Sequence, residues 1–402
     1  MSLISVEAAL KSLLADVKQT NIEQVPLLDA GARVLAKDVR ATRTQPPFSA
    51  SAMDGYAVRA SDTTRANDPL RVIGEAPAGH AYKGSLKQGE ALRIFTGAPI
   101  PDGANAILIQ EYARRDGEMV YALQSVDEGK HIRAAGLDFS QNDTLLHAGQ
   151  QLDYRALALA GAMNHPTLPV HCKPRVAILA NGDELVEPGQ VPGPNQIIAS
   201  NQIGIAELVR RSGAIPVMLG IAPDNEQEIA KRVTKAITLN CDILVTLGGA
   251  SVGDHDLIQK TLGNAGMDLE FWRIAMRPGK PLMAGSIGEM KVLGLPGNPV
   301  SSLVCGLLFL VPLIQTMLGQ SPATNPTDHP VLPLASPLPQ NDMRQDYVRA
   351  RIVSDSGRET LQPFKTQDSS MLSLFHQSQA LIIRPPHAPE ASEGKEVPYI
   401  PL

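Results

Sequence analysis

The sequence lacks the usual signs of a thiol or histidine metal site. Its three cysteines, Cys172, Cys241 and Cys305, are far apart and form no CxxC pair, and its nine histidines are scattered. Even His255 stands at no metal-ligand spacing. Neither a disulfide framework nor a zinc site is indicated, no catalytic histidine is assigned, and a reducing cytoplasm is the expected compartment.

An excess of basic charge is also lacking. Lysine and arginine number 36 against 41 acidic residues, which gives a net charge of -5, and the chain has no long basic run. Proteins that bind nucleic acid generally carry a basic patch or stripe. Nucleic acid is therefore not an expected partner.

Export and membrane signals are missing as well. The amino-terminal stretch MSLISVEAALKSLLADV has no basic region or cleavage site, and its apolar residues recur at helical spacing. The one long apolar run, Val300–Leu318, has about the minimum length of a membrane span, but Pro312 and polar residues interrupt it. We expect an ordinary amphipathic helix at the start, a buried core helix at Val300–Leu318, and no membrane partner.

The length of 402 residues permits two to four domains, because single cores rarely grow past roughly 250 to 300 residues. Changes in pattern predict an α/β multidomain chain with a doubly wound domain, an inserted β-rich domain and a small carboxyl-terminal β-barrel domain. Within the linking section, Val25–Lys37 predicts a short strand and a helix. The predicted sections are 1–20 (helix on the α/β domain), 21–41 with 142–172 (linking α/β domain), 42–141 (β-rich insertion), 173–322 (doubly wound domain) and 323–402 (β domain).

From Arg175 onward, strands and helices alternate. RVAILA, IPVMLGIA, DILVTL and KVLGL read as buried strands, and helical patterns separate the first three. Asp224 is predicted to cap the helix before DILVTL, with Gln227 completing a capping box. This order is typical of a doubly wound sheet, in which ligands bind at the carboxyl ends of the strands.

The most informative segment is Cys241–Asp256, CDILVTLGGASVGDHD. A buried strand ends in paired glycines, followed by small polar residues and two acids. Gly248, Gly249 and Gly253 would let backbone N–H groups approach an anion closely. The pattern is typical of a phosphate or pterin pocket, and the alternative is a glycine turn with no ligand.

A second glycine loop, MKVLGLPGNP (Met290–Pro299), also ends a predicted strand of this region. Between the two loops, FWRIAMRPGKP places Arg273, Arg277 and Lys280 near a Pro-Gly turn. Cations in such a turn suit an oxyanion ligand. A solvated hairpin tip is the alternative for each of them.

Together these segments resemble the MoeA family of molybdopterin molybdenumtransferases, which includes the carboxyl-terminal part of gephyrin. The resemblance covers essentially the whole chain, including the domain that binds molybdopterin. The motifs that carry it are PPFSASAMDGYAV, RIFTGAPIPDGAN, LANGDEL, TLGGASVGDHD, MRPGKP and GLPGNPVSS.

The resemblance implies the last step of molybdenum cofactor biosynthesis. Adenylylated molybdopterin and molybdate would give the molybdenum cofactor and AMP, with Mg²⁺ as the divalent cation. It also implies a cytoplasmic homodimer that works with the adenylyltransferase of the same pathway. Cleavage of a phosphoanhydride beside a metal requires carboxylates and cations in one cleft, and the chain has both.

The resemblance also implies site residues. Which acid binds Mg²⁺ and which is catalytic stays open, and for Asp54 a cap of the turn beside Gly55 is an alternative. The implied catalytic residues are Asp54, Thr96, Asp138 on the return strand of the insertion, Glu184, Asp224 and Asp256, of which Glu184, Asp224 and Asp256 are the implied metal ligands. The implied substrate-binding residues are Gly248, Gly249, Ser251, Gly253, Arg273, Arg277, Lys280, Pro296, Gly297, Asn298, Arg349 and Ser369.

Three positions depart from the family pattern, and at a fourth two adjacent serines match it about equally well. Arg273 and Arg277 stand where lysine is common, Ala250 replaces the usual valine or threonine, and Ser370 fits nearly as well as Ser369. In the family a second subunit completes the cleft, so Asp54 and Thr96 would serve the partner's site. Two alternative functions are considered. The chain could be a CinA-type nucleotide-cleaving enzyme, or a non-catalytic pterin-binding scaffold of the kind that gephyrin provides at synapses.

Overall fold

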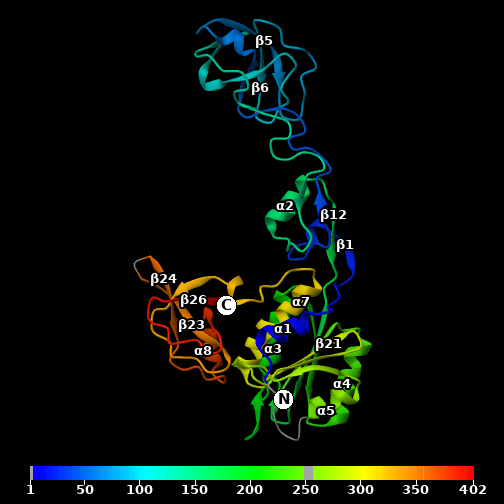
Figure 1. Cartoon of the computed structure of the whole chain (residues 1–402). Coiled ribbons are helices and arrows are strands. Elements are labelled where there is room, and N and C mark those ends of the chain that lie inside the picture. Colours follow the sequence, from blue (N-terminus) through cyan, green and yellow to red (C-terminus); the bar gives the residue numbers. More distant parts are fainter. Residues whose placement is uncertain (1–2, 249–256, 356) are drawn as a thin grey trace.

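The computed structural model describes residues 3–248, 257–355 and 357–402 and shows an elongated molecule (Figure 1). An α/β sheet and a small β unit lie together at one end, where both termini are found. A second β-rich unit lies at the opposite end, and a small unit with one helix lies between them. The predicted combination of an α/β core, a β-rich insertion and a carboxyl-terminal β unit is confirmed.

The core of the large end is a mixed six-stranded sheet. Its first four strands are parallel, and the last two run antiparallel to their neighbours. The central strand β17 is buried along its whole length, as its unbroken apolar sequence predicts. In spatial order the strands are β16 (Ile215–Ala222), β13 (Arg175–Asn181), β17 (Ile243–Leu247), β21 (Met290–Leu295), β20 (Met283–Ile287) and β18 (Asp268–Trp272).

Helices cover both faces of this sheet, so the predicted doubly wound arrangement is confirmed. The amino-terminal helix packs against the first face, as expected from its apolar spacing. On the first face lie α1 (Val6–Leu14), α3 (Asn201–Arg211), α6 (Pro299–Cys305), the π-helical turn η4 (Gly306–Leu310) and α7 (Val311–Met317); on the second lie α4 (Glu226–Thr238) and α5 (Leu257–Asn264).

The long apolar run is a core helix, as predicted. Among the described residues, Pro299–Met317 is the one helix long and apolar enough to cross a membrane, but 72% of it is buried inside the protein. Its side chains pack against β17, β21 and α1 in one hydrophobic cluster. Burial in this core accounts for its apolar character.

The predicted cap of α4 is wrong by one residue. Asn225 is the N-cap, and its Oδ1 accepts hydrogen bonds from the backbone N–H groups of Gln227 (2.9 Å) and Glu228 (3.2 Å). Both Asp and Asn are good N-cap residues, so the sequence alone does not distinguish two adjacent candidates. Asp224 therefore does not serve as the N-cap of α4, and its side chain is available for another role.

The middle unit contains one helix, and the helix predicted within Val25–Lys37 is absent there. After β1 the chain forms only the short 3-10 turn η1, and Val34 and Leu35 instead make isolated bridges to Gln151 and Val170. These extended pairings bury the apolar side chains that suggested a helix. The unit is built from β1 (Ile22–Pro26), η1 (Leu27–Asp29), β2 (Val39–Arg40), β11 (Thr144–Leu146), α2 (Tyr154–Ala162) and β12 (Thr167–His171).

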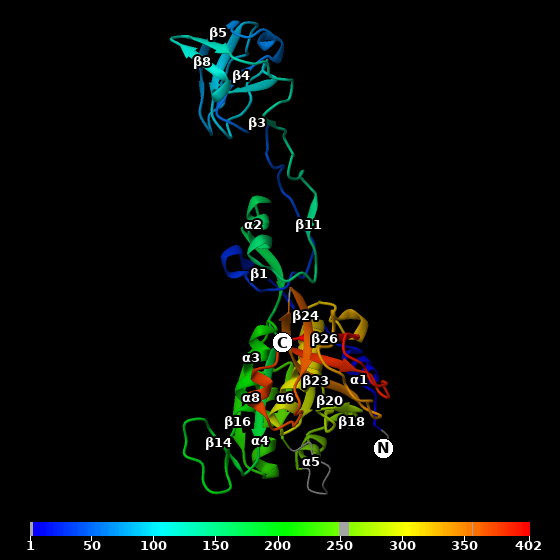
Figure 2. The same ribbon diagram turned by 90° about the vertical axis from the view of Figure 1, so that its left-hand side faces the viewer.

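The distant unit is a second six-stranded sheet with a short two-stranded ribbon at its base (Figure 2). The order of its strands is β7 (Ala106–Ile109), β4 (Gly55–Val58), β6 (Glu90–Ile94), β5 (Pro69–Ala76), β9 (Met119–Ala122) and β8 (Ala113–Asp116); η2 (Ala60–Thr63) and η3 (Gln110–Tyr112) connect them, and β3 (Ala50–Ser51) with β10 (Ile132–Arg133) forms the ribbon.

The carboxyl-terminal unit is a small barrel. Its strands pair in the order β22, β26, β25, β23 and β24, and a bridge between Leu334 and Leu361 brings the two ends of this order together. A strand from the α/β unit, β19 (Met276–Arg277), also pairs with β23. The bounds are η5 (Pro326–Asp328), β22 (Val331–Pro333), β23 (Gln345–Asp355), β24 (Arg358–Pro363), α8 (Leu372–His376), β25 (Ala380–Arg384) and β26 (Glu396–Pro401).

Candidate functional site

A cavity of about 750 Å³ lies at the carboxyl ends of β13, β17 and β21. The short strands β14 (Leu185–Val186) and β15 (Ile197–Ile198) form one wall, and the start of α6 forms another. This is the edge where parallel α/β sheets bind their ligands. The predicted site residues among its lining are Glu184, Asp224, Gly248, Pro296, Gly297 and Asn298.

Two of the predicted acids line this cavity. Asp224 accepts a hydrogen bond from Asn181 Nδ2 at 2.8 Å, and its backbone N–H donates to the Asp183 carboxylate at 3.1 Å. Glu184 folds over Gly182, whose φ is +145° and where an added Cβ would lie 2.3 Å from Glu184 Oε2. Glycine at 182 thus permits the position of the Glu184 carboxylate.

The two glycine loops meet, as their places after neighbouring strands suggest. Gly248 adopts a φ of +97°, and a Cβ added to it would lie 2.9 Å from the Asn181 carbonyl oxygen. A Cβ on Gly297 would lie 3.7 Å from Gly248 Cα. The positive φ and the close carbonyl require glycine at 248, whereas a side chain at 297 would make only ordinary contact with Gly248. Four predicted residues, Gly249, Ser251, Gly253 and Asp256, lie outside the described residues.

The barrel contacts the rim of the cavity through Ser369. The Asn298 Nδ2 donates to Ser369 Oγ at 3.1 Å, and the Val300 N–H donates to the Ser369 carbonyl at the same distance. Ser370 instead donates to Asp368 at 2.6 Å. Of the two serines, Ser369 therefore lies against a cavity residue.

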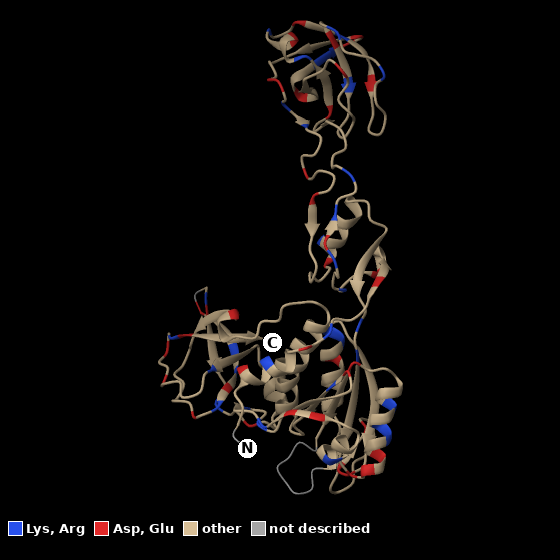
Figure 3. Cartoon of the chain, turned by 45° about the vertical axis from the view of Figure 1, so that its right-hand side comes forward, with Lys and Arg blue, Asp and Glu red and all other residues tan. Residues whose placement is uncertain are grey.

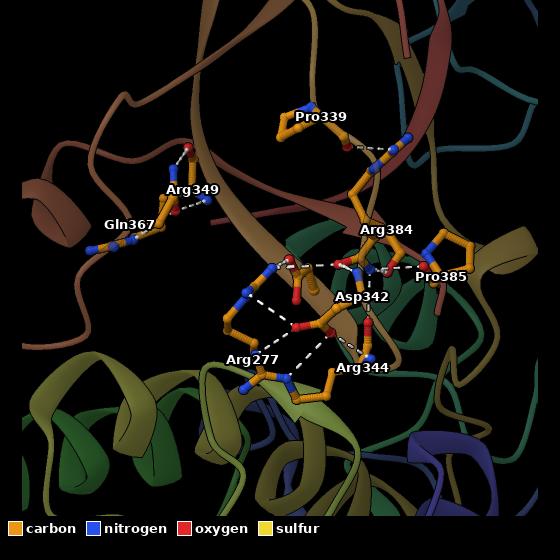
Figure 4. A network of polar contacts seen from close by, with 10 residues as sticks. Arg277, Pro339, Asp342, Arg344, Arg349, Gln367, Arg384 and Pro385 are labelled. Carbon is orange, nitrogen blue, oxygen red and sulfur yellow. Dashed lines mark hydrogen bonds and ion pairs between the residues drawn. The ribbon is translucent and has the colours of Figure 1, made fainter. Parts of the chain in front are cut away.

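Arg349 is buried inside the barrel, with 2% of its surface exposed. Its Nε and its backbone N–H both donate to Gln367 Oε1, at 3.3 and 2.9 Å (Figure 4). Burial lowers the pKa of Arg349, and the nearby Asp368 carboxylate partly offsets this. A buried guanidinium still carries its charge, so Arg349 favours an anion nearby.

The three predicted cations have different surroundings. Arg277 forms ion pairs with Asp346 and, at 3.5 Å, with Asp342, both on the barrel (Figure 4). The Arg273 guanidinium lies over the Trp272 ring, 4.8 Å from its centre. Lys280 is exposed and has no ion pair within the described ranges. Arg277 thus docks the barrel, and none of the three cations is among the residues that line the cavity, although Pro281 beside Lys280 is.

The two carboxylates that pair with Arg277 have pKa values shifted in opposite directions. Hydrogen bonds from Arg344 hold the pKa of Asp342 at about 2. Burial raises the pKa of Asp346 against the attraction of Arg277. Asp346 is therefore the carboxylate that depends on Arg277, since Asp342 keeps Arg344 as a partner.

Replacing Arg277 by Met is expected to reduce the free energy of unfolding by roughly 1–3 kcal/mol, because Asp346 would be left buried and unpaired. Since the folded-state pKa of Asp346 is raised, the loss should shrink as the pH falls toward 3.8, the ordinary pKa of an aspartate. Urea unfolding at several pH values measures it. The control Arg344→Met should lose less than about 1 kcal/mol; equal losses would contradict the assignment.

Asp54 and Thr96 lie together in the distant unit. The Thr96 N–H and Oγ1 each donate to the Asp54 carboxylate at 2.8 Å, and these bonds, the backbone one first, lower the pKa of Asp54. The Asp54 carboxylate therefore stabilises the turn at Thr96. These hydrogen bonds do not involve the turn beside Gly55.

Asp138 lies in a bend after β10, outside any strand, which corrects its predicted placement on a return strand.

Within one chain these three residues are far from the cavity (Figure 2). The unit that contains β3 and β4 lies at the opposite end of the molecule from β14 and α5, which border the cavity. The structure therefore brings together Glu184, Asp224 and the glycine loops, but not Asp54, Thr96 and Asp138. Acidic and basic residues are interspersed along all parts of the chain (Figure 3).

The sequence interpretation missed Asn181. This residue ends β13, lines the cavity and bonds Asp224. The sequence signal that could have identified Asn181 is a polar side chain at the end of a buried apolar strand. In the described part of the chain, no group of three or more His, Cys, Asp or Glu residues is arranged so that it could hold a metal ion by itself.

Three segments of the chain match families of known proteins. Residues 4–163 match the MoeA N-terminal region (domain I and II), 177–316 match a probable molybdopterin binding domain, and 331–402 match the MoeA C-terminal region (domain IV).

Full-length relatives show the same similarity. A molybdopterin molybdenumtransferase of Nostoc sp. is 35% identical over 392 residues, 96% of this chain and 89% of the relative. One from Haemophilus influenzae is 32% identical over 95% of this chain and 94% of the relative. The crystal structure of the molybdopterin biosynthesis moeA protein from Pyrococcus horikoshii OT3 has a TM-score of 0.84 and 30% identity, and the match covers 100% of both chains.

Proposed function

The chain belongs to the MoeA family, and we propose on this basis that it is a molybdopterin molybdenumtransferase. It would insert molybdate into adenylylated molybdopterin and release AMP, the last step of molybdenum cofactor biosynthesis. Relatives of this name match along nearly the whole chain. The structural observation that supports the proposal most is the cavity in which Glu184, Asp224 and both glycine loops meet.

The residues of the cavity suit the cleavage of a phosphoanhydride. Backbone N–H groups near Gly248 and Gly297 can approach phosphate oxygens, because no Cβ shields them. The Glu184 and Asp224 carboxylates line the cavity and can orient an attacking water molecule. Lys280 is exposed next to Pro281, a cavity residue, and would supply a positive charge for the molybdate dianion. Which carboxylate orients the water stays open.

The donor set also fits Mg²⁺. Proteins usually bind this ion through one or two carboxylates, with substrate phosphates completing its coordination. Glu184 and Asp224 would hold it, and the third predicted ligand, Asp256, lies outside the described residues. When bound, Mg²⁺ would offset the charge on the phosphate oxygens.

We propose further that the protein acts as a cytoplasmic homodimer and receives its substrate from the adenylyltransferase of the same pathway. The three cysteines are unpaired, which suits a reducing compartment. The distance of Asp54 and Thr96 from the cavity of their own chain supports a role for them in the partner's site. The CinA-type and scaffold alternatives are less well supported, because relatives matching over 95% of the chain are named transferases.

The deciding experiment is AMP release from adenylylated molybdopterin by the purified protein, coupled to reconstitution of a molybdenum-free apoenzyme. We expect release that requires both molybdate and Mg²⁺ and that restores the activity of the apoenzyme. Tight binding of the pterin without AMP release would contradict the proposal and support a carrier or scaffold.

A further inference from the structure

Asn181 lines the cavity and is itself buried. It is the last residue of β13, directly before the Gly182 turn, and 6% of its surface is exposed. A buried amide normally has partners for both its donor and its acceptor. Within residues 3–248, 257–355 and 357–402, only the donor of Asn181 has a partner.

The donor side of the amide is directed at Asp224. Asn181 Nδ2 lies 2.8 Å from Asp224 Oδ1. The other hydrogen bond to this carboxylate, from the Asp183 N–H to Oδ2, is long at 3.5 Å. Asn181 therefore supplies the short hydrogen bond that fixes the orientation of the Asp224 carboxylate.

The acceptor side of the amide has no partner among the described residues. Asn181 Oδ1 is buried and receives no hydrogen bond from the part of the chain that the structure describes. It faces Gly248, where an added Cβ would lie 3.5 Å away. A buried carbonyl without a donor is costly, so its presence in the cavity lining points to a donor from a bound molecule.

We propose that Asn181 is a positioning residue that couples the substrate to Asp224. Its N–H holds the Asp224 carboxylate, and its carbonyl accepts a hydrogen bond from an N–H or O–H group of the substrate in the cavity. Substrate binding and the orientation of Asp224 are then linked through one rigid amide. This inference rests on the proposed transferase function.

The test is Asn181→Leu, which keeps the number and branching of the side-chain heavy atoms and removes both polar groups. We expect kcat for AMP release to fall about 10- to 100-fold, the range typical for partners that orient a functional ligand. KM should rise, because the substrate loses a contact. The midpoint of urea unfolding should stay unchanged or increase, since the unpaired carbonyl is gone. A purely structural role predicts the opposite change in the midpoint.

A double-mutant cycle tests the coupling. If Asn181 controls kcat through Asp224, Asn181→Leu should change kcat less than about 2-fold in an Asp224→Asn background, measured in single turnovers. The control is Asn201→Leu: Asn201 also lines the cavity but donates to the Gly297 carbonyl, so its effect should multiply with that of Asp224→Asn.

Three results would overturn the inference: a wild-type kcat for Asn181→Leu, a kcat loss that multiplies with that of Asp224→Asn, or a fall in the unfolding midpoint that accompanies the fall in kcat. An active parent protein with an unaffected variant overturns the inference alone. A parent protein that releases no AMP overturns the proposed function and this inference with it.

Discussion

Asp224→Asn is expected to lower kcat for AMP release by about 100-fold or more, because a neutral amide cannot replace a carboxylate that orients water or binds a cation. The fold should be unaffected. Asp224 does not cap α4, and its carboxylate is exposed in the cavity. The measurements are single-turnover AMP release and the midpoint of urea unfolding.

The neighbouring residue provides a matched control. Asn225→Ala removes the N-cap of α4 and should cost about 1 kcal/mol of stability, with AMP release retained. The two adjacent substitutions should thus separate function from stability. If Asp224→Asn loses stability and keeps its activity, Asp224 is a structural residue and its assignment to the site is wrong.

A heterodimer of one Asp54→Asn chain and one Asp224→Asn chain is expected to have about half of the wild-type activity, although each variant alone should be nearly inactive. In such a dimer, the cavity of the Asp54→Asn chain keeps its own Asp224 and receives Asp54 from the partner. The other cavity has neither. Two affinity tags allow this heterodimer to be purified and its AMP release to be measured.

The reciprocal arrangement is the control. A chain with both substitutions, paired with a wild-type chain, has no complete site if the sites are shared, and it should be inactive. If every site were built from a single chain, the results would be reversed: this control would have half activity and the mixed pair of single variants none. The comparison therefore tests the proposed homodimer and its shared cavity together.

Local patterns predicted the parts of the site that neighbouring strands build. β17 and β21 are adjacent and parallel, so the glycine loops that follow them had to lie close together. Short unbroken apolar runs bounded by glycines identified these strands, because a strand buried on both faces accepts such a sequence. The predicted core helix at Val300–Leu318 followed from the same reasoning.

Long-range pairing was beyond prediction from the sequence. The partners of Arg277, Asp342 and Asp346, are more than 60 residues away in the chain, and no local pattern connects them. The same applies to Asn181, because helix α3 and strand β16 lie between it and its partner Asp224 in the chain. The placement of Asp54 far from the other acids is likewise a property of the complete fold.

The pairing of β19 with β23 means that the carboxyl-terminal barrel is not a detachable module. Met276 and Arg277 extend the barrel sheet, and Tyr347, Leu381 and Ile383 of the barrel belong to the hydrophobic cluster of the α/β unit. A chain cut before the barrel would expose this shared core and leave β19 without its neighbour. The barrel therefore cannot be exchanged in evolution for another domain unless the new domain also pairs with β19 and completes the shared hydrophobic cluster.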